Sequence, residues 1–180
     1  MLELKDATLT LGGRRLFERL SLMAPSGQMT CVTGPEGCGK TALVQVMLGF
    51  LLPDVGLVSV DGELLTPLSA PTFRRLMAYL PQKREVTITP VEANISGLEA
   101  VWAPLDSRRY QLTPIDEHLD VAPLASKPIV IADDPDPSML SVLKSLAAGG
   151  HTVVVASQLE EYINLSDKII MLGNHDTVIS

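Results

Sequence analysis

The spacing of apolar positions predicts two kinds of strand. Residues 2–11 and 15–23 alternate apolar with polar side chains, which is typical of strands with one face in the core. The alternation slips near Lys5-Asp6, which indicates a bulge in the first strand. Farther along, short runs are apolar at almost every position, as in strands buried on both faces. These runs are residues 29–33, 129–132, 152–156 and 168–172.

Helical spacing appears between these runs. Leu43, Val46, Met47, Phe50 and Leu51 recur at the spacing of one helix face, which predicts a helix over residues 40–52. Shorter helices are predicted at 73–76, 138–148 and 159–165, and further strands at 56–60, 77–80 and 177–179. Strands that alternate with helices favour a parallel sheet, with ligand chemistry at the carboxyl ends of its strands.

A glycine-rich turn joins the strand at 29–33 to this long helix. It reads Gly34-Pro35-Glu36-Gly37-Cys38-Gly39-Lys40-Thr41 and fits the phosphate-loop pattern in the strand, turn and helix context that the pattern requires. Glycines let successive backbone N–H groups point inward, and the helix N-terminus adds partial positive charge. Lys40 is then predicted to contact the β- and γ-phosphates of a nucleotide, and the Thr41 hydroxyl to hold Mg²⁺.

Composition restricts the class of protein. The 180 residues suit one domain, and the net charge of −7 argues against nucleic acid as the main partner. No segment approaches the roughly 18 uninterrupted apolar residues of a membrane helix, and charged residues near the start argue against a signal peptide. The two cysteines predict free thiols in the cytoplasm. Cys38, inside the loop, is either an oxidation-sensitive thiol or a small residue tolerated there.

The order of motifs resembles that of the nucleotide-binding subunits of ABC transporters along the whole chain. The resemblance rests on residues 15–41, on 56–82 ending in Tyr79-Leu80-Pro81-Gln82, and on 91–95, 119–128 and 129–135. It implies an α/β P-loop NTPase core with a mostly parallel sheet, an N-terminal antiparallel β subdomain and a reduced helical subdomain. It further implies that residues 1–180 form a single nucleotide-binding domain, with the reduced insert at about 83–125.

The resemblance also implies roles for individual residues. Gln82 is expected to contact Mg²⁺ and the attacking water, Asp133 to hold Mg²⁺ through a water, and Asp134 to lie where the general base is expected. Leu11 falls where the family has an aromatic residue that stacks on adenine. The implied ligands are ATP and Mg²⁺. The implied partners are a second copy or another ABC-type ATPase subunit, together with a separate membrane-spanning subunit. Through that subunit the chain would lie at the inner face of the membrane. Nucleic acid is not an expected partner.

Several positions depart from the family pattern. Asp134 is one methylene shorter than the usual glutamate, and capping of the following turn is an equally good explanation for it. The switch histidine is replaced by Ser157-Gln158. The signature sequence corresponds best to residues 112–116, with 95–99 as the rival. The span from Gln82 to Asp133 is only 133 − 82 = 51 positions, shorter than is usual in the family.

Three hypotheses follow for function. The intact loop beside weakened catalytic positions favours an ATP-binding protein with weak or lost hydrolysis, acting as a degenerate partner or regulatory subunit. The alternative is an active ATPase subunit that energises an ABC transporter through a separate membrane protein, with Asp134 as base. The distant alternative is another P-loop kinase or NTPase, to which arginine pairs such as Arg108-Arg109 would contribute a lid.

Overall fold

Two β-sheets enclose a helix in the computed structural model, which describes residues 1–82, 122–173 and 177–179, the last three as backbone only. The antiparallel sheet has the order β2 (Arg14–Ala24), β1 (Leu2–Leu11), β4 (Val55–Val60), β5 (Glu63–Leu64). The predicted bulge is confirmed, because the β1–β2 register shifts between Leu4 and Ala7 and Asp6 has a φ of +49°. Asp61 and Gly62, both with positive φ, turn β4 into β5.

The second sheet is parallel except at one edge. Its order is β10 (Thr177–Ile179), β9 (Lys168–Met171), β3 (Met29–Thr33), β8 (Thr152–Ala156), β7 (Ile129–Asp133), β6 (Met77–Leu80), and only the β10–β9 pair is antiparallel. Every residue of β3, β7 and β8 is buried, as their continuous apolar runs predict. The predicted α/β core with a mostly parallel sheet and an N-terminal antiparallel unit is confirmed.

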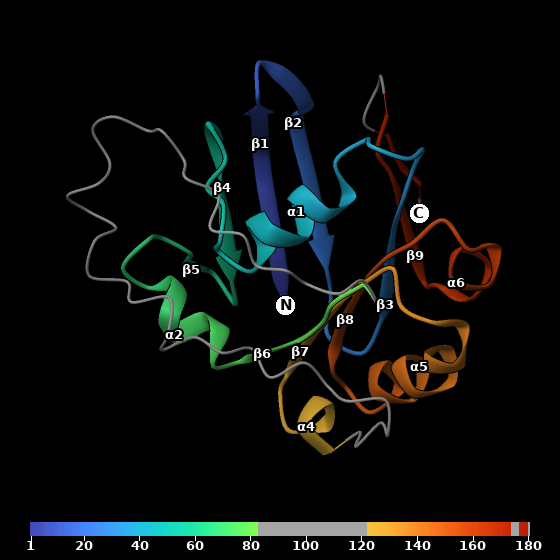
Figure 1. The fold of residues 1–180 in the computed structure, drawn as a ribbon. Helices are drawn as coiled ribbons and strands as arrows, with labels where there is room; N and C mark the ends of the chain where they lie inside the picture. The colour runs from blue at the N-terminus through green and yellow to red at the C-terminus, as the bar shows by residue number, and fades with distance from the viewer. Residues whose placement is uncertain (83–121, 174–176, 180) are drawn as a thin grey trace.

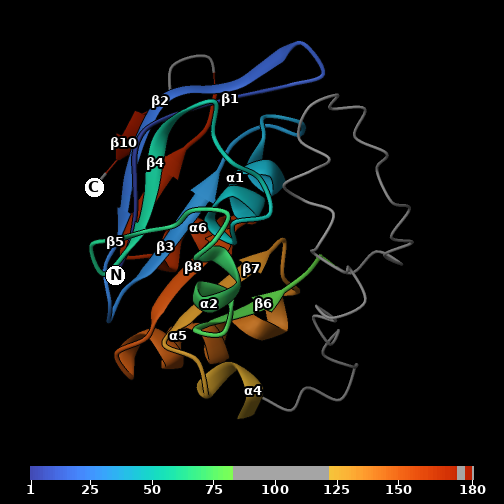
Figure 2. The same cartoon turned by 90° about the vertical axis from the view of Figure 1, so that its left-hand side faces the viewer.

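Helices cover both faces of the parallel sheet (Figures 1 and 2). On one face, α1 (Lys40–Met47) packs between the two sheets in a core that includes Val32. The opposite face, which includes Cys31, packs against α4 (Ala122–Ala125), α5 (Leu140–Ala148) and α6 (Glu160–Leu165). Cys31 and Val32, which are neighbours in β3, therefore pack in two different cores, because successive side chains of a strand point to opposite faces. A 3₁₀ turn (Pro137–Met139) leads into α5.

Two predicted helix boundaries are wrong. The first helix ends at Met47 rather than at 52, because Gly49 adopts a left-handed φ of +69°. A Cβ at Gly49 would lie 2.8 Å from Leu65, so the chain turns there against close neighbours. Phe50 is consequently 39 % exposed and carries the Arg74 guanidinium 4.9 Å from its ring centre. The helix expected at 73–76 is α2 (Ala70–Arg74), which starts earlier with a proline in its first turn.

Some predictions lie outside the described residues. These are the family match at 91–95, both candidates for the signature sequence (112–116 and 95–99), and most of the insert at 83–125. Across the part of the chain that the structure describes, no helix has the length and apolarity to cross a membrane. Cys31 and Cys38 are both free thiols, as predicted.

Candidate functional site

The phosphate loop, residues 34–41, connects the carboxyl end of β3 to the first turn of α1. Its three glycines all have positive φ, which lets the backbone curl around the helix N-terminus. Gly34 also has no room for a side chain, since a Cβ would lie 2.3 Å from the carbonyl oxygen of Leu172. A Cβ at Gly39 would lie 3.1 Å from the Leu16 side chain, so Leu16 from β2 packs directly on the loop.

The Lys40 side chain folds back over the loop. Its ammonium donates to the carbonyl oxygen of Gly34 at 2.8 Å and to that of Pro35 at 3.1 Å, and lies 3.9 Å from the sulfur of the buried Cys38. These contacts hold the positive charge of Lys40 against carbonyl oxygens at the start of the loop. The loop and its lysine thus concentrate positive potential at one end of α1.

Thr41 and Asp133 meet across the interior of the site. The Thr41 hydroxyl donates a 3.3 Å hydrogen bond to the Asp133 carboxylate, which ends β7 and is only 4 % exposed. Burial is the largest cause that raises the pKa of Asp133, and the Asp134 charge raises it further. The hydrogen bond from Thr41 and the charge of Lys40 both lower this pKa. Burial, with the charge of Asp133, also raises the pKa of Tyr79 on β6 to about 12.

Asp134 is held by two side chains that follow the strands on either side of β7. One carboxylate oxygen accepts a 2.8 Å hydrogen bond from the Gln82 amide, and the other accepts a 3.4 Å hydrogen bond from the Ser157 hydroxyl. The Asp134 backbone has a left-handed φ of +48°, and its N–H donates to the carbonyl oxygen of Ala156 at 2.7 Å. The carboxyl ends of β6, β7 and β8 therefore converge on one carboxylate.

Gln158 reaches the phosphate loop from the segment after β8. Its amide nitrogen donates a 2.9 Å hydrogen bond to the Gly34 carbonyl oxygen, which also accepts from Lys40. The sequence pattern marks Ser157-Gln158 only as a missing histidine. Their contacts with Asp134 and Gly34 depend on the adjacency of β3, β7 and β8, which the chain order alone does not specify.

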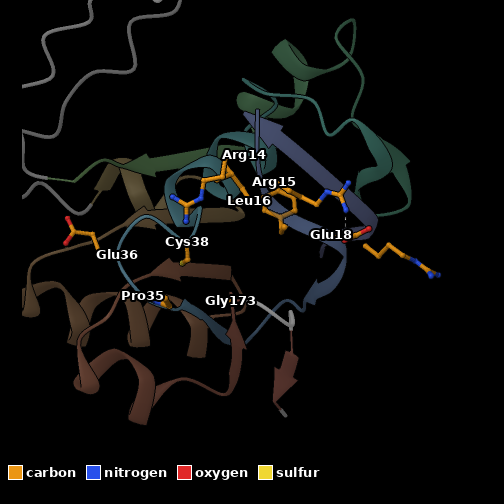
Figure 3. Close-up of a pocket in the computed structure, with 10 residues that line it drawn as sticks. Arg14, Arg15, Leu16, Glu18, Pro35, Glu36, Cys38 and Gly173 are labelled. Carbon is orange, nitrogen blue, oxygen red and sulfur yellow. Dashed lines mark ion pairs between the residues drawn. The ribbon is translucent and has the colours of Figure 1, made fainter. Parts of the chain in front are cut away.

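These side chains line one pocket of about 480 Å³. The pocket brings together the predicted residues Glu36, Gly37, Gly39, Lys40, Thr41, Gln82, Asp133 and Asp134, and adds Leu16, Ala42 and Gln158. A second pocket, of about 650 Å³, adjoins the loop and takes its lining from β2 together with Pro35, Glu36, Cys38 and Gly173 (Figure 3). The Arg14 guanidinium points toward the loop there, whereas Arg15 pairs with Glu18 at 2.7 Å.

Leu11 lies apart from both of these pockets. It ends β1 with 41 % of its surface exposed and does not line either of these two pockets. Leu16, which the sequence reasoning did not select, contacts the loop and lines both. The sequence carries only a partial signal for Leu16, as an apolar residue beside the core residue Phe17 in β2. Its contact with the loop is set by tertiary packing.

The oxygen atoms in the first pocket fit a small divalent cation. Mg²⁺ takes oxygen ligands and commonly uses one or two carboxylates together with phosphate oxygens and waters. The Thr41 hydroxyl and the buried Asp133 carboxylate converge at the end of the loop, and the Gln82 amide lies in the same pocket. Among the described residues, no cluster of three or more His, Cys, Asp or Glu side chains is placed to hold a metal ion.

Comparison with known proteins places this geometry in a family. A family model described as "ABC transporter" matches residues 17–142, which run from β2 through the phosphate loop and Asp133 to α5. The chain belongs to the ABC transporter family. Among solved structures, the dimeric post-hydrolysis state of the ATP-binding cassette MJ0796, bound to ADP and Pi, matches with a TM-score of 0.67 at 18 % identity. The match covers 100 % of this chain and 99 % of that one.

Curated relatives of this ABC transporter family member are longer. The Fe(3+) ions import ATP-binding protein FbpC of Pseudomonas fluorescens is 37 % identical over 83 residues, covering 45 % of this chain and 23 % of the relative. The choline transport ATP-binding protein OpuBA of Bacillus subtilis is 24 % identical over 212 residues, covering 96 % of this chain and 55 % of the relative. The chain thus spans about a quarter to about half of these two relatives. The OpuBA alignment runs over 212 positions, more than the 180 residues of this chain, so it includes gaps.

Proposed function

We propose that this chain binds Mg-ATP as the nucleotide-binding subunit of an ABC-type assembly and hydrolyses it weakly or not at all. The observation that carries the proposal is the convergence of Lys40, Thr41, Gln82 and Asp133 on one pocket at the carboxyl ends of the parallel strands. Membership of the ABC transporter family removes the distant alternative of another P-loop kinase or NTPase.

The loop supports a specific orientation for the triphosphate. Backbone N–H groups of residues 37–41 and the N-terminus of α1 would receive phosphate oxygens, and the Lys40 ammonium would turn from its carbonyl partners to the β- and γ-phosphates. A bound Mg²⁺ would neutralise charge on the phosphates. Thr41 and Asp133 would hold it, and Gln82 would orient a nearby water. Leu11 remains the proposed base contact from the family pattern. Leu16 is an apolar residue that packs on the phosphate loop at Gly39.

Weak hydrolysis is proposed from the surroundings of Asp134. Both of its carboxylate oxygens accept hydrogen bonds from the protein, so a water to be activated would share either oxygen with the Gln82 amide or the Ser157 hydroxyl. Its side chain is also one methylene shorter than the glutamate of the family pattern, and a displacement of about 1 Å costs on the order of 10²-fold in rate. Ser157, at the switch-histidine position, carries no charge to a γ-phosphate.

The assembly is proposed from the family. The MJ0796 cassette of similar fold is dimeric. We propose that this chain, as a single domain over residues 1–180 with a reduced insert, pairs with a second copy or with another ABC-type ATPase subunit. A separate membrane-spanning subunit would hold the pair at the cytoplasmic face of the membrane. The short insert reduces the surface available for binding that subunit. This favours a role for the chain as a regulatory subunit or as a degenerate partner of another ATPase subunit.

A second candidate is a working ATPase with Asp134 as base. The observation in its favour is that Asp134 lines the same pocket as Lys40 and Thr41, with Gln82 directly beside it. A carboxylate and an amide in that relationship are the groups that activate and orient water.

Phosphate release from Mg-ATP by the purified chain separates the two candidates. Lys40→Ala serves as the blank and Lys5→Ala, an exposed lysine on β1, as the matched control. The proposal expects turnover at the level of the blank, Mg-ATP binding by the wild type and by Lys5→Ala, and no binding by Lys40→Ala. Asp134→Asn should then leave the turnover unchanged.

Two results would contradict the proposal in different ways. Turnover well above the blank that rises more steeply than linearly with protein concentration, and that falls in Asp134→Asn, would establish the working dimeric ATPase. Absence of Mg-ATP binding in a calorimetric titration of the folded wild type would remove nucleotide binding altogether.

A further inference from the structure

We propose that Gln158 is a positioning residue for Lys40. Its side-chain amide keeps the Gly34 carbonyl oxygen hydrogen-bonded when the lysine turns to the phosphates of a nucleotide, and so favours the lysine position that binds. This inference rests on the proposed nucleotide binding and deepens it by assigning a role to a residue outside the phosphate loop.

The first step is the cost of moving the lysine. The Lys40 ammonium donates to the carbonyl oxygens of Gly34 and Pro35, and a nucleotide that engages it removes both hydrogen bonds. Pro35 is exposed, so water can replace the lysine there. Gly34 is half-buried, and the contact of its carbonyl oxygen with Lys40 is part-buried, unlike the exposed contact at Pro35. A carbonyl in such a place gains less from water and needs a donor from the protein.

The second step is that Gln158 already supplies this donor. Its amide nitrogen lies 2.9 Å from the Gly34 oxygen, while the Lys40 nitrogen lies 2.8 Å from the same atom. A carbonyl oxygen has two lone pairs and can accept both. When the lysine leaves, the Gly34 oxygen therefore keeps one partner. When the lysine is in place, it shares the Gly34 oxygen with Gln158, which weakens the hydrogen bond between Lys40 and Gly34.

The third step is that the segment carrying Gln158 is fixed relative to the loop. The Ser157 N–H donates to the Val32 carbonyl at 3.0 Å, which ties the segment after β8 to β3, the strand that enters the loop. The Leu159 N–H donates to the Ser157 hydroxyl at 3.2 Å, which closes a turn around Gln158. The Gln158 side chain is exposed and packs in neither core. Its hydrogen bond to the Gly34 oxygen therefore holds it against the loop.

Calorimetric titration with Mg-ATP and Mg-ADP tests the inference, with thermal melting of the nucleotide-free protein alongside. Gln158→Met keeps the length of the side chain but cannot donate, and the expected loss of affinity is roughly threefold to tenfold for both nucleotides, the equivalent of one hydrogen bond. Gln158→His at pH 8 restores an N–H donor and is expected to bind within about twofold of the wild type. Gln28→Met, an exposed glutamine in the turn before β3, is the matched control and should bind as the wild type does.

The outcomes distinguish this inference from the proposed function. The role of the amide would be overturned if Gln158→Met bound nucleotide as tightly as the wild type. It would also be overturned if Gln158→His bound as weakly as Gln158→Met. A lower melting temperature of nucleotide-free Gln158→Met with unchanged affinity would make the contact purely structural and would also overturn it. Absence of nucleotide binding in the wild type would instead remove the proposed function on which the inference rests.

Discussion

The Gln82 amide donates a 2.8 Å hydrogen bond to the Asp134 carboxylate. The two residues follow β6 and β7, which pair in parallel with Leu80 opposite Ala132, so their side chains leave the sheet at the same edge. The family pattern assigns water orientation to the first residue and base catalysis to the second. In this chain the two groups are hydrogen-bonded to each other, and a water placed between them would compete with that hydrogen bond.

Restoring the family residues around Asp134 should raise turnover. The double variant Asp134→Glu, Ser157→His places a longer carboxylate and an imidazole where the pattern expects them, and the expected gain in phosphate release is about tenfold to a hundredfold over the wild type. Adding Lys40→Ala to the double variant should return the rate to the blank. A double variant that binds Mg-ATP normally and stays at the blank level would show that the weakness lies elsewhere in the chain.

The Thr41 hydroxyl should matter for nucleotide only when Mg²⁺ is present. Thr41→Val keeps the shape of the side chain but removes the group that meets Asp133 at 3.3 Å. We expect the affinity for ATP to fall by roughly tenfold with Mg²⁺ and to change little in EDTA, since one oxygen contact is lost. Titrations under both conditions measure the difference. An equal loss in EDTA would assign the hydroxyl to the phosphates or to the loop itself.

Gly34→Ala should destabilise the fold as well as the site. Its φ of +149° is poorly suited to an L-residue, and the new Cβ would lie 2.3 Å from the backbone oxygen of Leu172. We expect the free energy of unfolding in urea to fall by about 2–4 kcal/mol. Gly27→Ala is the matched control, since φ is +80° but nothing lies within 4 Å of its Cβ position, and a loss of about 1–2 kcal/mol is expected. Equal losses for the two variants would contradict the steric argument.

Asp167 should make stability depend on acid pH. The Met29 N–H, which donates to its carboxylate at 2.8 Å, is the main cause that holds the pKa of Asp167 below its usual value, followed by Lys144 at 3.0 Å. A lowered native pKa gives stability that is present above the unfolded pKa of about 3.9 and lost as pH falls through the native pKa.

The corresponding variant is Asp167→Asn. We expect it to be less stable than the wild type at pH 7 by about 1 kcal/mol, allowing for solvent screening, and the difference to shrink below about pH 4. Thermal melts from pH 2.5 to 7 measure it. Lys144→Met should have a smaller effect because the backbone N–H remains. A difference that is constant across this range would exclude the ionised carboxylate as its source.

Much of the fold was predictable because it depends on local pattern. The alternation in β1 and β2, the apolar runs of β3, β7 and β8, and the bulge at Asp6 all follow from neighbouring residues. The end of α1 was predicted too late, since the apolar spacing continues past Gly49 while the backbone turns there to fit against Leu65 and Ala70. Spacing records which face of a helix is apolar but not where packing ends the helix.

The sequence by itself determined the phosphate loop, because its glycines, lysine and threonine are contiguous and their backbone conformations are local. Only the tertiary structure decided how the loop is completed. Gln158 reaches Gly34 from 124 positions away, and Thr41 reaches Asp133 from 92 positions away. Those contacts exist because β3, β8 and β7 lie side by side in the sheet, an order that strand propensity does not encode. The pairing of strands places distant side chains within hydrogen-bonding distance, and from those contacts we infer the lysine's positioning residue.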